Sequence, residues 1–182
     1  PRPRPPQNMR KTEPGLTWVG GNRSHDELDE TSRKILAASS AGTSIFDPVL
    51  CELAYRWFSP VGGVVLDPFA GGSVRGIVAA KLGRQYVGVD LRPEQIEANR
   101  QQAAQICGEG MAPAWTVGDS RNIADLCKGV EADLLFSCPP YADLERYSDD
   151  ERDLSTMDYP LFREAYRQII AAACRMLKAD RF

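Results

Sequence analysis

The sequence predicts an α/β fold in which helices flank a mostly parallel sheet, and three observations lead to this class. Short apolar runs typical of strands alternate with helical patterns from Val64 to Leu177, which is the arrangement of βαβ units. Glycine and proline stand where these helices end or begin. Acidic residues follow three of the apolar runs, at the sheet edge where open α/β proteins bind ligands.

Residues 1–15 differ in composition from the rest of the chain. They hold five prolines and several basic residues, so a flexible linker is favoured and a basic arm against a phosphate backbone is the alternative. Residues 16–182 are expected to form one folded domain. Its first helices are predicted at Ser24–Ala38 and Pro48–Phe58. The residues expected on the buried face of the second helix are Leu50, Leu53, Ala54 and Trp57.

The alternation of strands and helices begins after these two helices. A strand at Val64–Leu66 precedes a helix at Val74–Leu82, which Gly83 closes. The next strand, Tyr86–Val89, precedes a helix at Pro93–Ile106 that has proline in its first turn. The remaining expected elements are strands at Ala114–Val117 and Asp133–Phe136, a short helix at Ile123–Cys127 and a last helix at Tyr159–Leu177.

The last helix and the residues after it define one edge of the predicted sheet. Asp158 is a suitable N-cap for this helix. The residues expected on its buried face are Phe162, Tyr166, Ile169, Ile170 and Ala173. The sequence ends at Phe182 after four predicted strands. Because an unpaired strand edge promotes aggregation, we expect further C-terminal sequence or a partner subunit to cover the exposed sheet edge.

Composition excludes several classes of protein. No apolar run approaches the length of a membrane span, and the first residues lack the apolar stretch of a signal peptide, so a cytoplasmic location is expected. The five cysteines form no CxxC pair, which argues against a disulfide framework and a metal site. The net charge of -3 argues against broad electrostatic binding of nucleic acid by this chain alone.

The segment DPFAGG, Asp67 to Gly72, indicates a cofactor site. Asp67 follows a predicted buried strand, Gly71 and Gly72 permit close approach of a ligand, and the N–H groups of the next helix can receive a carboxylate. With Gly76, these glycines do not fit the GxGxxG spacing of dinucleotide sites. A carboxylate in the turn would repel a pyrophosphate but suits an ammonium or sulfonium group. The segment therefore predicts S-adenosylmethionine as the cofactor.

Two further carboxylates follow the next two strands. Asp90 lies about 20 residues after the glycine turn, where an acidic residue that accepts ribose hydroxyls is expected. Asp119, in the segment GDS, is expected near the adenine amino group. Three carboxylates at three successive strand ends support one nucleoside-cofactor site.

The segment CPPY, Cys138 to Tyr141, is a rigid turn after the fourth strand. An exocyclic amino group of adenine or cytosine is a poor nucleophile, and acceptors aimed at its N–H groups can orient its lone pair toward a methyl donor. Pro139 offers a carbonyl acceptor, and Pro140 stiffens the turn. Tyr141 offers a flat face for stacking a flipped base. A plain exposed turn is the alternative if the cofactor site is absent.

Together these motifs resemble those of the amino-methyltransferases that modify adenine or cytosine in DNA, of phage and bacterial type, over roughly residues 40–182. The resemblance implies a Rossmann-like fold, a DNA substrate, and transfer of a methyl group that leaves S-adenosylhomocysteine, as in restriction-modification. SIFDPVL, Ser44 to Leu50, is similar to the family's additional cofactor-side motif. The implied cofactor-binding residues are Phe46, Asp47, Pro48, Asp67, Pro68, Phe69, Ala70, Gly71, Gly72, Asp90, Leu91, Asp119 and Ser120. The implied catalytic residues are Cys138, Pro139, Pro140 and Tyr141.

Two departures from the family leave alternatives open. Cys138 stands where the family has Asp, Asn or Ser, and a thiol is a weak acceptor. Either Pro139 makes most of the amino-group contact, or Ser137 contributes, or the enzyme is slow or inactive. No target-recognition domain is recognisable, and it would follow Phe182. The alternative functions are methylation of RNA or of a protein glutamine amide, and an inert S-adenosylmethionine-binding module.

An acidic loop is predicted at Ala142–Met157, between the CPPY turn and the last helix. A solvated loop is the favoured interpretation, and a lid over the target base is the alternative.

Overall fold

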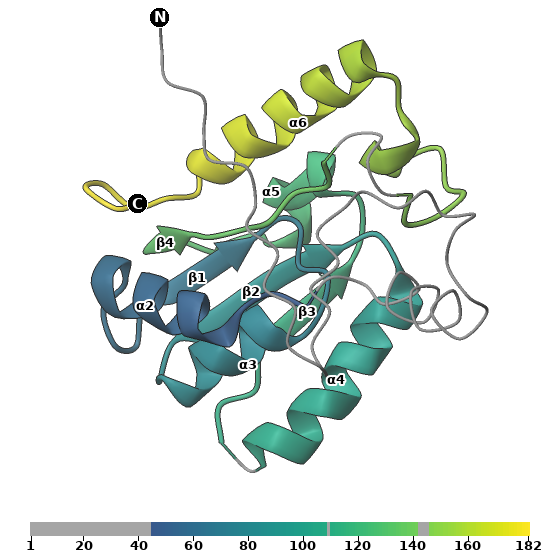
Figure 1. The fold of residues 1–182 in the computed structure, drawn as a ribbon. Helices are drawn as coiled ribbons and strands as arrows, with labels where there is room; N and C mark the ends of the chain where they lie inside the picture. Colours follow the sequence, from purple (N-terminus) through teal and green to yellow (C-terminus); the bar gives the residue numbers. More distant parts are fainter. Residues whose placement is uncertain (1–44, 109, 142–145) are drawn as a thin grey trace, which may run out of the picture. The chain divides into compact units, whose positions relative to one another are not determined.

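The structure is a computed structural model, and it describes residues 45–182 except 109 and 142–145. The predictions for residues 1–15 and for a helix at Ser24–Ala38 lie outside the described residues. Residues 43–182 form one compact unit. Its sheet is parallel, with the strand order β3-β2-β1-β4 (Figure 1), so the predicted α/β class is confirmed. The strands are β1 (Val64–Asp67), β2 (Gln85–Asp90), β3 (Ala114–Val117) and β4 (Leu134–Leu135).

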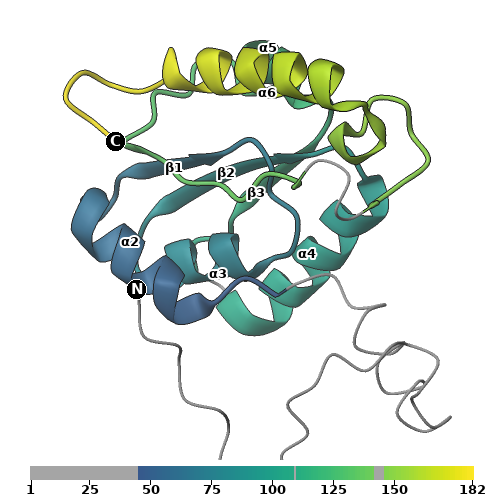
Figure 2. The ribbon, with the colours of Figure 1, turned by 45° about the horizontal axis from the view of Figure 1, so that its top comes forward.

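Helices cover both faces of this sheet (Figure 2). One layer contains α2 (Pro48–Phe58), α3 (Val74–Lys81) and α4 (Pro93–Cys107). The other layer contains α5 (Ile123–Leu126) and α6 (Tyr159–Cys174). Two short 3-10 helices, η2 (Ser120–Asn122) and η4 (Leu154–Thr156), lie in the connections.

Each face of the sheet has its own hydrophobic core, because neighbouring residues of a strand point to opposite faces. Val65 and Tyr86 pack in the cluster that includes residues of α2, α3 and α4. Leu66 and Val89 pack in the cluster with residues of α5 and α6. The central strands are thus buried on both sides, which explains their continuous apolar sequences.

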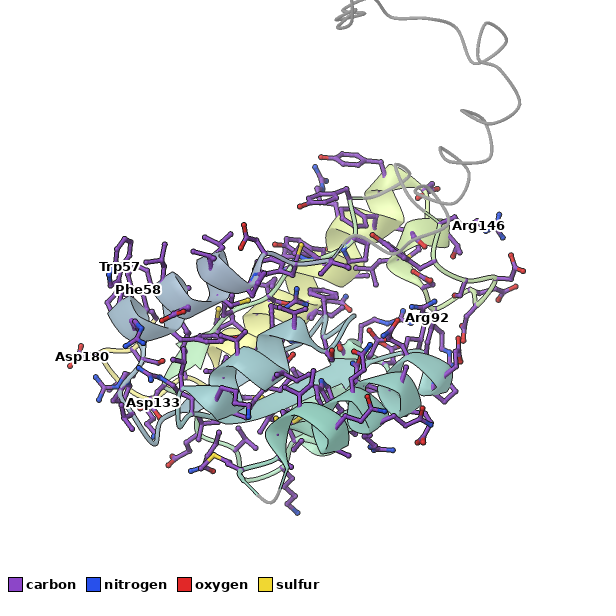
Figure 3. The ribbon with its side chains drawn as sticks, turned by 60° about the horizontal axis from the view of Figure 1, so that its bottom comes forward. Trp57, Phe58, Arg92, Asp133, Arg146 and Asp180 are labelled. Carbon is purple, nitrogen blue, oxygen red and sulfur yellow. The ribbon has the colours of Figure 1, made fainter. Side chains whose placement is uncertain are left out.

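Helix α2 has the predicted bounds, and Ala54 is buried as predicted, but the other three residues of the predicted buried face are not. Cys51, Ala54 and Tyr55 are buried, whereas Leu50, Leu53 and Trp57 are exposed, Trp57 to 71%. Tyr55 turns inward because its hydroxyl donates to the carbonyl of Arg75 at 3.0 Å. Trp57 and Phe58 consequently project outward from α2 (Figure 3). The helical spacing of the apolar residues separates two faces of α2, but it does not show which of the two faces packs against the sheet.

Helix α6 begins as predicted, since the Asp158 side chain accepts a hydrogen bond from the N–H of Leu161 at 3.0 Å. It ends at Cys174, before the predicted end at Leu177. Ile169 and Ala173 are buried as expected. The three predicted core residues that are only half-buried are Phe162, Tyr166 and Ile170. Phe162 and Tyr166 pack against a small cluster of Leu154, Ala165 and Ile169.

The residues after α6 run along the outer side of β4. The N–H of Leu135 donates to the carbonyl of Phe182 at 2.7 Å. Buried Asp133, labelled in Figure 3, pairs with Lys178 at 2.7 Å and Arg181 at 3.1 Å. The residues after α6 thus contact the outer side of β4. The expectation that further sequence or a partner subunit covers the sheet edge stays a prediction.

Gly76 in α3 is expected to tolerate no larger residue. A Cβ there would lie 2.6 Å from Cζ2 of Trp115 and 3.1 Å from Cδ1 of Tyr86. Both rings are buried, so Gly76→Ala should lower the free energy of unfolding by about 1–3 kcal/mol, measured by urea denaturation. Gly72→Ala is the control, since a Cβ there meets nothing within 4 Å. Equal stability of the two variants would contradict this expectation.

Candidate functional site

The C-terminal ends of the four strands surround one cavity of about 590 Å³. This is the edge at which open parallel sheets bind ligands. The sequence-predicted site residues in its wall are Phe46, Asp47, Pro68, Phe69, Gly71, Gly72, Asp90, Leu91, Asp119, Ser120, Cys138, Pro139, Pro140 and Tyr141. The three that the cavity wall does not include are Pro48, Asp67 and Ala70. The cofactor and CPPY segments, far apart in the sequence, thus face the same space.

Asp67 lies beneath the cavity, with 0% of its surface exposed. One carboxylate oxygen accepts from Arg75 Nε at 2.6 Å and Tyr86 Oη at 2.7 Å. The other accepts from Ser137 Oγ at 2.5 Å and from the N–H of Phe69 at 3.0 Å. These four partners use the hydrogen-bonding capacity of the carboxylate. Asp67 therefore lies buried below the cofactor turn, outside the cavity wall, and its predicted role in cofactor binding stays a prediction.

Arg75 is the main residue that the sequence analysis missed. Its Nη2 donates to the carbonyls of Phe69 at 2.6 Å and Ala70 at 3.0 Å, and its guanidinium carbon lies 4.9 Å from the ring centroid of Phe46. Burial opposes the charged form, but the adjacent Asp67 carboxylate outweighs this effect and raises the pKa of Arg75. The signal in the sequence was an arginine within the otherwise apolar run of residues 74–80.

Helix α4 holds the glycine turn in place. Gly71, at φ 48°, donates its N–H to Asp90 Oδ2 at 2.8 Å. Its carbonyl accepts from Nδ2 of Asn99 at 2.7 Å, and Ser73 Oγ donates to Gln102 Oε1 at 2.5 Å. Asn99 and Gln102 were also missed, because polar residues in a helix give no signal of a tertiary contact.

The Asp90 carboxylate faces the cavity and keeps acceptor capacity. Besides the Gly71 bond, its Oδ1 accepts from the N–H of Arg92 at 2.9 Å, which leaves a lone pair on each oxygen for a ligand. Burial raises the pKa of Asp90 above its ordinary value of 3.8, although the two N–H groups act in the opposite direction.

The Asp119 carboxylate is more fully engaged. It pairs with Arg121 Nη2 at 2.6 Å and caps η2 through the N–H of Arg121 at 2.9 Å. Partial burial would raise the pKa of Asp119, but the bonds from Arg121 hold it below its ordinary value. Ser120 next to it donates to the carbonyl of Pro68 at 2.5 Å, which joins the third strand end to the cofactor turn.

The CPPY turn forms the opposite wall. Tyr141 is 59% exposed, and its hydroxyl lies 3.7 Å from the Cys138 sulfur. Pro139 and Pro140 are half-buried beside the cavity. Ser137 is already bonded to Asp67 and does not line the cavity. This placement disfavours the alternative in which Ser137 contacts the substrate amino group.

The described part of the acidic loop contributes to the same wall. Tyr147, Arg152 and Leu154 line the cavity. Arg92, labelled in Figure 3, donates to the carbonyl of Tyr147 at 3.4 Å, and Ser148 Oγ donates to Asp153 Oδ2 at 2.7 Å. The loop is thus more than a solvated connection. Residues 142–145 of it lie outside the described residues.

Metal ligands and membrane spans are both missing from the described part of the chain. In residues 45–182, apart from the gaps named above, no cluster of three His, Cys, Asp or Glu side chains could hold a metal ion. No helix in the same residues is long and apolar enough to cross a membrane.

Comparisons with known proteins agree with this geometry. Residues 22–101 match a family model described as DNA methylase, as the sequence resemblance predicts, and this match supports S-adenosylmethionine as the cofactor. No curated protein matches the chain.

Two solved structures illustrate the similarity in fold. TrmN from Thermus thermophilus is 21% identical with a TM-score of 0.58, and the match covers 78% of this chain and 38% of TrmN. An rRNA methylase from Streptococcus thermophilus is 13% identical with a TM-score of 0.50, over 75% of this chain and 67% of that one. The chain therefore spans well under half the length of TrmN. The fold is Rossmann-like α/β.

Proposed function

We propose that this chain, in which residues 22–101 match the DNA methylase family, transfers a methyl group from S-adenosylmethionine to an exocyclic amino group of adenine or cytosine in DNA. The observation that supports this most directly is that the glycine turn and the CPPY turn face one cavity. We also propose that residues 16–182 act as the catalytic domain, and that the activity serves a restriction-modification system.

The residues on the cofactor side fit S-adenosylmethionine. Gly71 has a positive φ, and nothing lies within 4 Å of a Cβ built at Gly72, so a ligand can approach the backbone closely. The spare lone pairs of Asp90 suit the two ribose hydroxyls. A volume of about 590 Å³ lies within the range of cofactor pockets. When bound, the cofactor supplies an electrophilic methyl group.

The residues on the substrate side suit a planar amino group. The Pro139 carbonyl can accept an N–H of the base, which turns the nitrogen lone pair toward the methyl donor. Tyr141 is exposed enough to stack on a flipped base. Cys138 is a weak acceptor, so in this proposal Pro139 makes the main contact with the amino group. No enzyme nucleophile is needed, because the amino nitrogen itself attacks the methyl carbon. The carbon–sulfur bond breaks to release S-adenosylhomocysteine, and the nitrogen loses one proton to solvent.

The first test is transfer of labelled methyl from S-adenosylmethionine to DNA, RNA and protein by the wild type and by Asp90→Ala. We expect label in DNA, located by sequencing on adenine N6 or cytosine N4, and at least a tenfold loss of cofactor affinity in the variant, as one ribose-binding carboxylate is lost. If the label appears only in RNA or only in protein glutamine, that acceptor replaces DNA as the proposed substrate. Cofactor binding without transfer to any acceptor would favour the inert module.

Cofactor affinity is also expected to depend on pH through Asp90. Its pKa is raised by burial, and only the ionised form accepts from both ribose hydroxyls. The affinity for S-adenosylmethionine should therefore be highest at pH values above the raised pKa of Asp90. It should fall as the pH drops through that pKa, and this fall should occur at a higher pH than for an ordinary carboxyl group. Calorimetric titration across acidic pH would measure this. Asp90→Asn should remove the dependence, and an unchanged profile in that variant would contradict the assignment.

A further inference from the structure

We propose that Asp67 and Ser137 form a link that positions the CPPY turn against the cofactor turn. The inference deepens the proposed function and rests on it. In this proposal neither side chain touches substrate or cofactor. Both are positioning residues that act through the turns on either side of them.

A single hydroxyl group connects the two turns. Ser137 Oγ donates to Asp67 Oδ1 at 2.5 Å and accepts from the N–H of Phe69 at 3.2 Å. Asp67 and Phe69 belong to the cofactor turn, and Ser137 immediately precedes Cys138. The two segments are 70 residues apart in the sequence, so this contact is tertiary and is not a local turn bond.

The anchor of the link is rigid. The other oxygen of Asp67 is held by Arg75 from α3 and Tyr86 from β2. Arg75 also binds the carbonyls of Phe69 and Ala70. Displacing the Asp67 carboxylate would leave a buried charge without its partners, which is strongly unfavourable. Ser137 is therefore attached to a fixed point.

The link lies where the backbone hydrogen bonding between β1 and the segment that contains β4 ends. The N–H of Phe136 donates to the carbonyl of Leu66 at 3.1 Å, and β4 itself ends at Leu135. One residue further on, the Ser137 hydroxyl continues the connection by means of its side chain. The residues after it, Cys138 to Tyr141, form a wall of the cavity. Their distance from the glycine turn therefore depends on this contact.

Methyl transfer is sensitive to such a distance. A misplacement of about 1 Å between reacting groups can cost on the order of a hundredfold in rate. In this proposal Asp90 and the glycine turn bind the cofactor. The two bonds that hold Gly71, from its N–H to Asp90 and from Asn99 of α4 to its carbonyl, do not involve Ser137. Loss of the link should consequently affect turnover more than cofactor affinity.

The test compares Ser137→Ala, Ser137→Thr and the wild type in methyl transfer and calorimetry. Ser137→Ala should lower kcat about tenfold or more and change S-adenosylmethionine affinity by less than about threefold. Ser137→Thr keeps the hydroxyl and should restore most of the rate. The matched control is Ser59→Ala, because Ser59 is a serine away from the cavity whose hydroxyl donates to the carbonyl of Tyr55 and accepts from Arg84. An unchanged kcat in Ser137→Ala, or an equal loss in Ser59→Ala, would overturn the proposal.

A second measurement does not depend on activity. Alkylation of Cys138 by a thiol reagent, relative to exposed Cys174, should become about fivefold faster in Ser137→Ala, since loss of one hydrogen bond of ordinary strength loosens the turn. It should not change in Ser59→Ala. Equal alkylation in all three proteins would overturn the link. If the wild type binds cofactor but methylates no nucleic acid, the proposed function is contradicted. The alkylation rates of Cys138 then still test the link between Ser137 and Asp67.

Discussion

Replacing Arg75 with methionine is expected to lower the free energy of unfolding by about 3–5 kcal/mol, because it removes one partner of a buried ion pair. The Arg75–Asp67 pair, at 2.6 Å, has side-chain exposures of 5% and 0%. Methionine fills similar space but leaves Asp67 charged and buried. It also releases two carbonyls of the cofactor turn. Urea denaturation followed by circular dichroism would measure the loss.

Two controls make this expectation specific. Arg167→Met breaks an exposed pair with Glu164 and should leave stability almost unchanged, because exposed pairs contribute little. Adding Asp67→Asn to Arg75→Met should recover part of the loss, since the uncompensated charge disappears. A single Arg75→Met variant as stable as the wild type would refute the structural role given to this pair.

Replacing Tyr141 with alanine is expected to lower methyl transfer by about 10–100-fold, because stacking of a base on an aromatic ring is worth about 1–3 kcal/mol. Tyr141 lines the cavity and is 59% exposed, so its ring can be covered by a base. Tyr141→Phe should keep most of the activity, although it loses the hydroxyl near the Cys138 sulfur. Single-turnover transfer of labelled methyl to DNA would measure the rates.

The control for Tyr141 is an exposed aromatic residue away from the cavity wall. Trp57→Ala removes such a ring from α2 and should not change the rate. S-adenosylmethionine affinity should be similar in all of these variants. If Tyr141→Ala transferred methyl at the wild-type rate, the CPPY turn would not be the base-binding element.

Much of the fold followed from local signals in the sequence. The strand and helix segments could be placed because periodicity, Gly83 and Pro93 are local features. Parallel strands then bring their C-terminal ends to one edge, which is why Asp90, Asp119 and the CPPY turn could be expected in one cavity from the sequence alone. The structure places all of them in its wall.

The remaining features depend on tertiary contacts that no local pattern contains. Asp67 was expected to face a ligand, and its burial follows from partners on α3, β2 and the segment after β4. The orientation of α2 likewise depends on the bond from Tyr55 to the carbonyl of Arg75. In both cases the bonding partners lie on other elements and are set by the packing of those elements.

The position of β1 at the centre of the sheet also bears on the order in which the site assembles during folding. Asp67 is 8 residues from Arg75 and 19 from Tyr86, but 70 from Ser137. Short loops close at a lower entropic cost and faster than long ones. The cofactor half of the site is therefore expected to form early, within the β1–α3–β2 unit. The half that contains the CPPY turn would be completed in a later step, when β4 docks against a strand that is already in place.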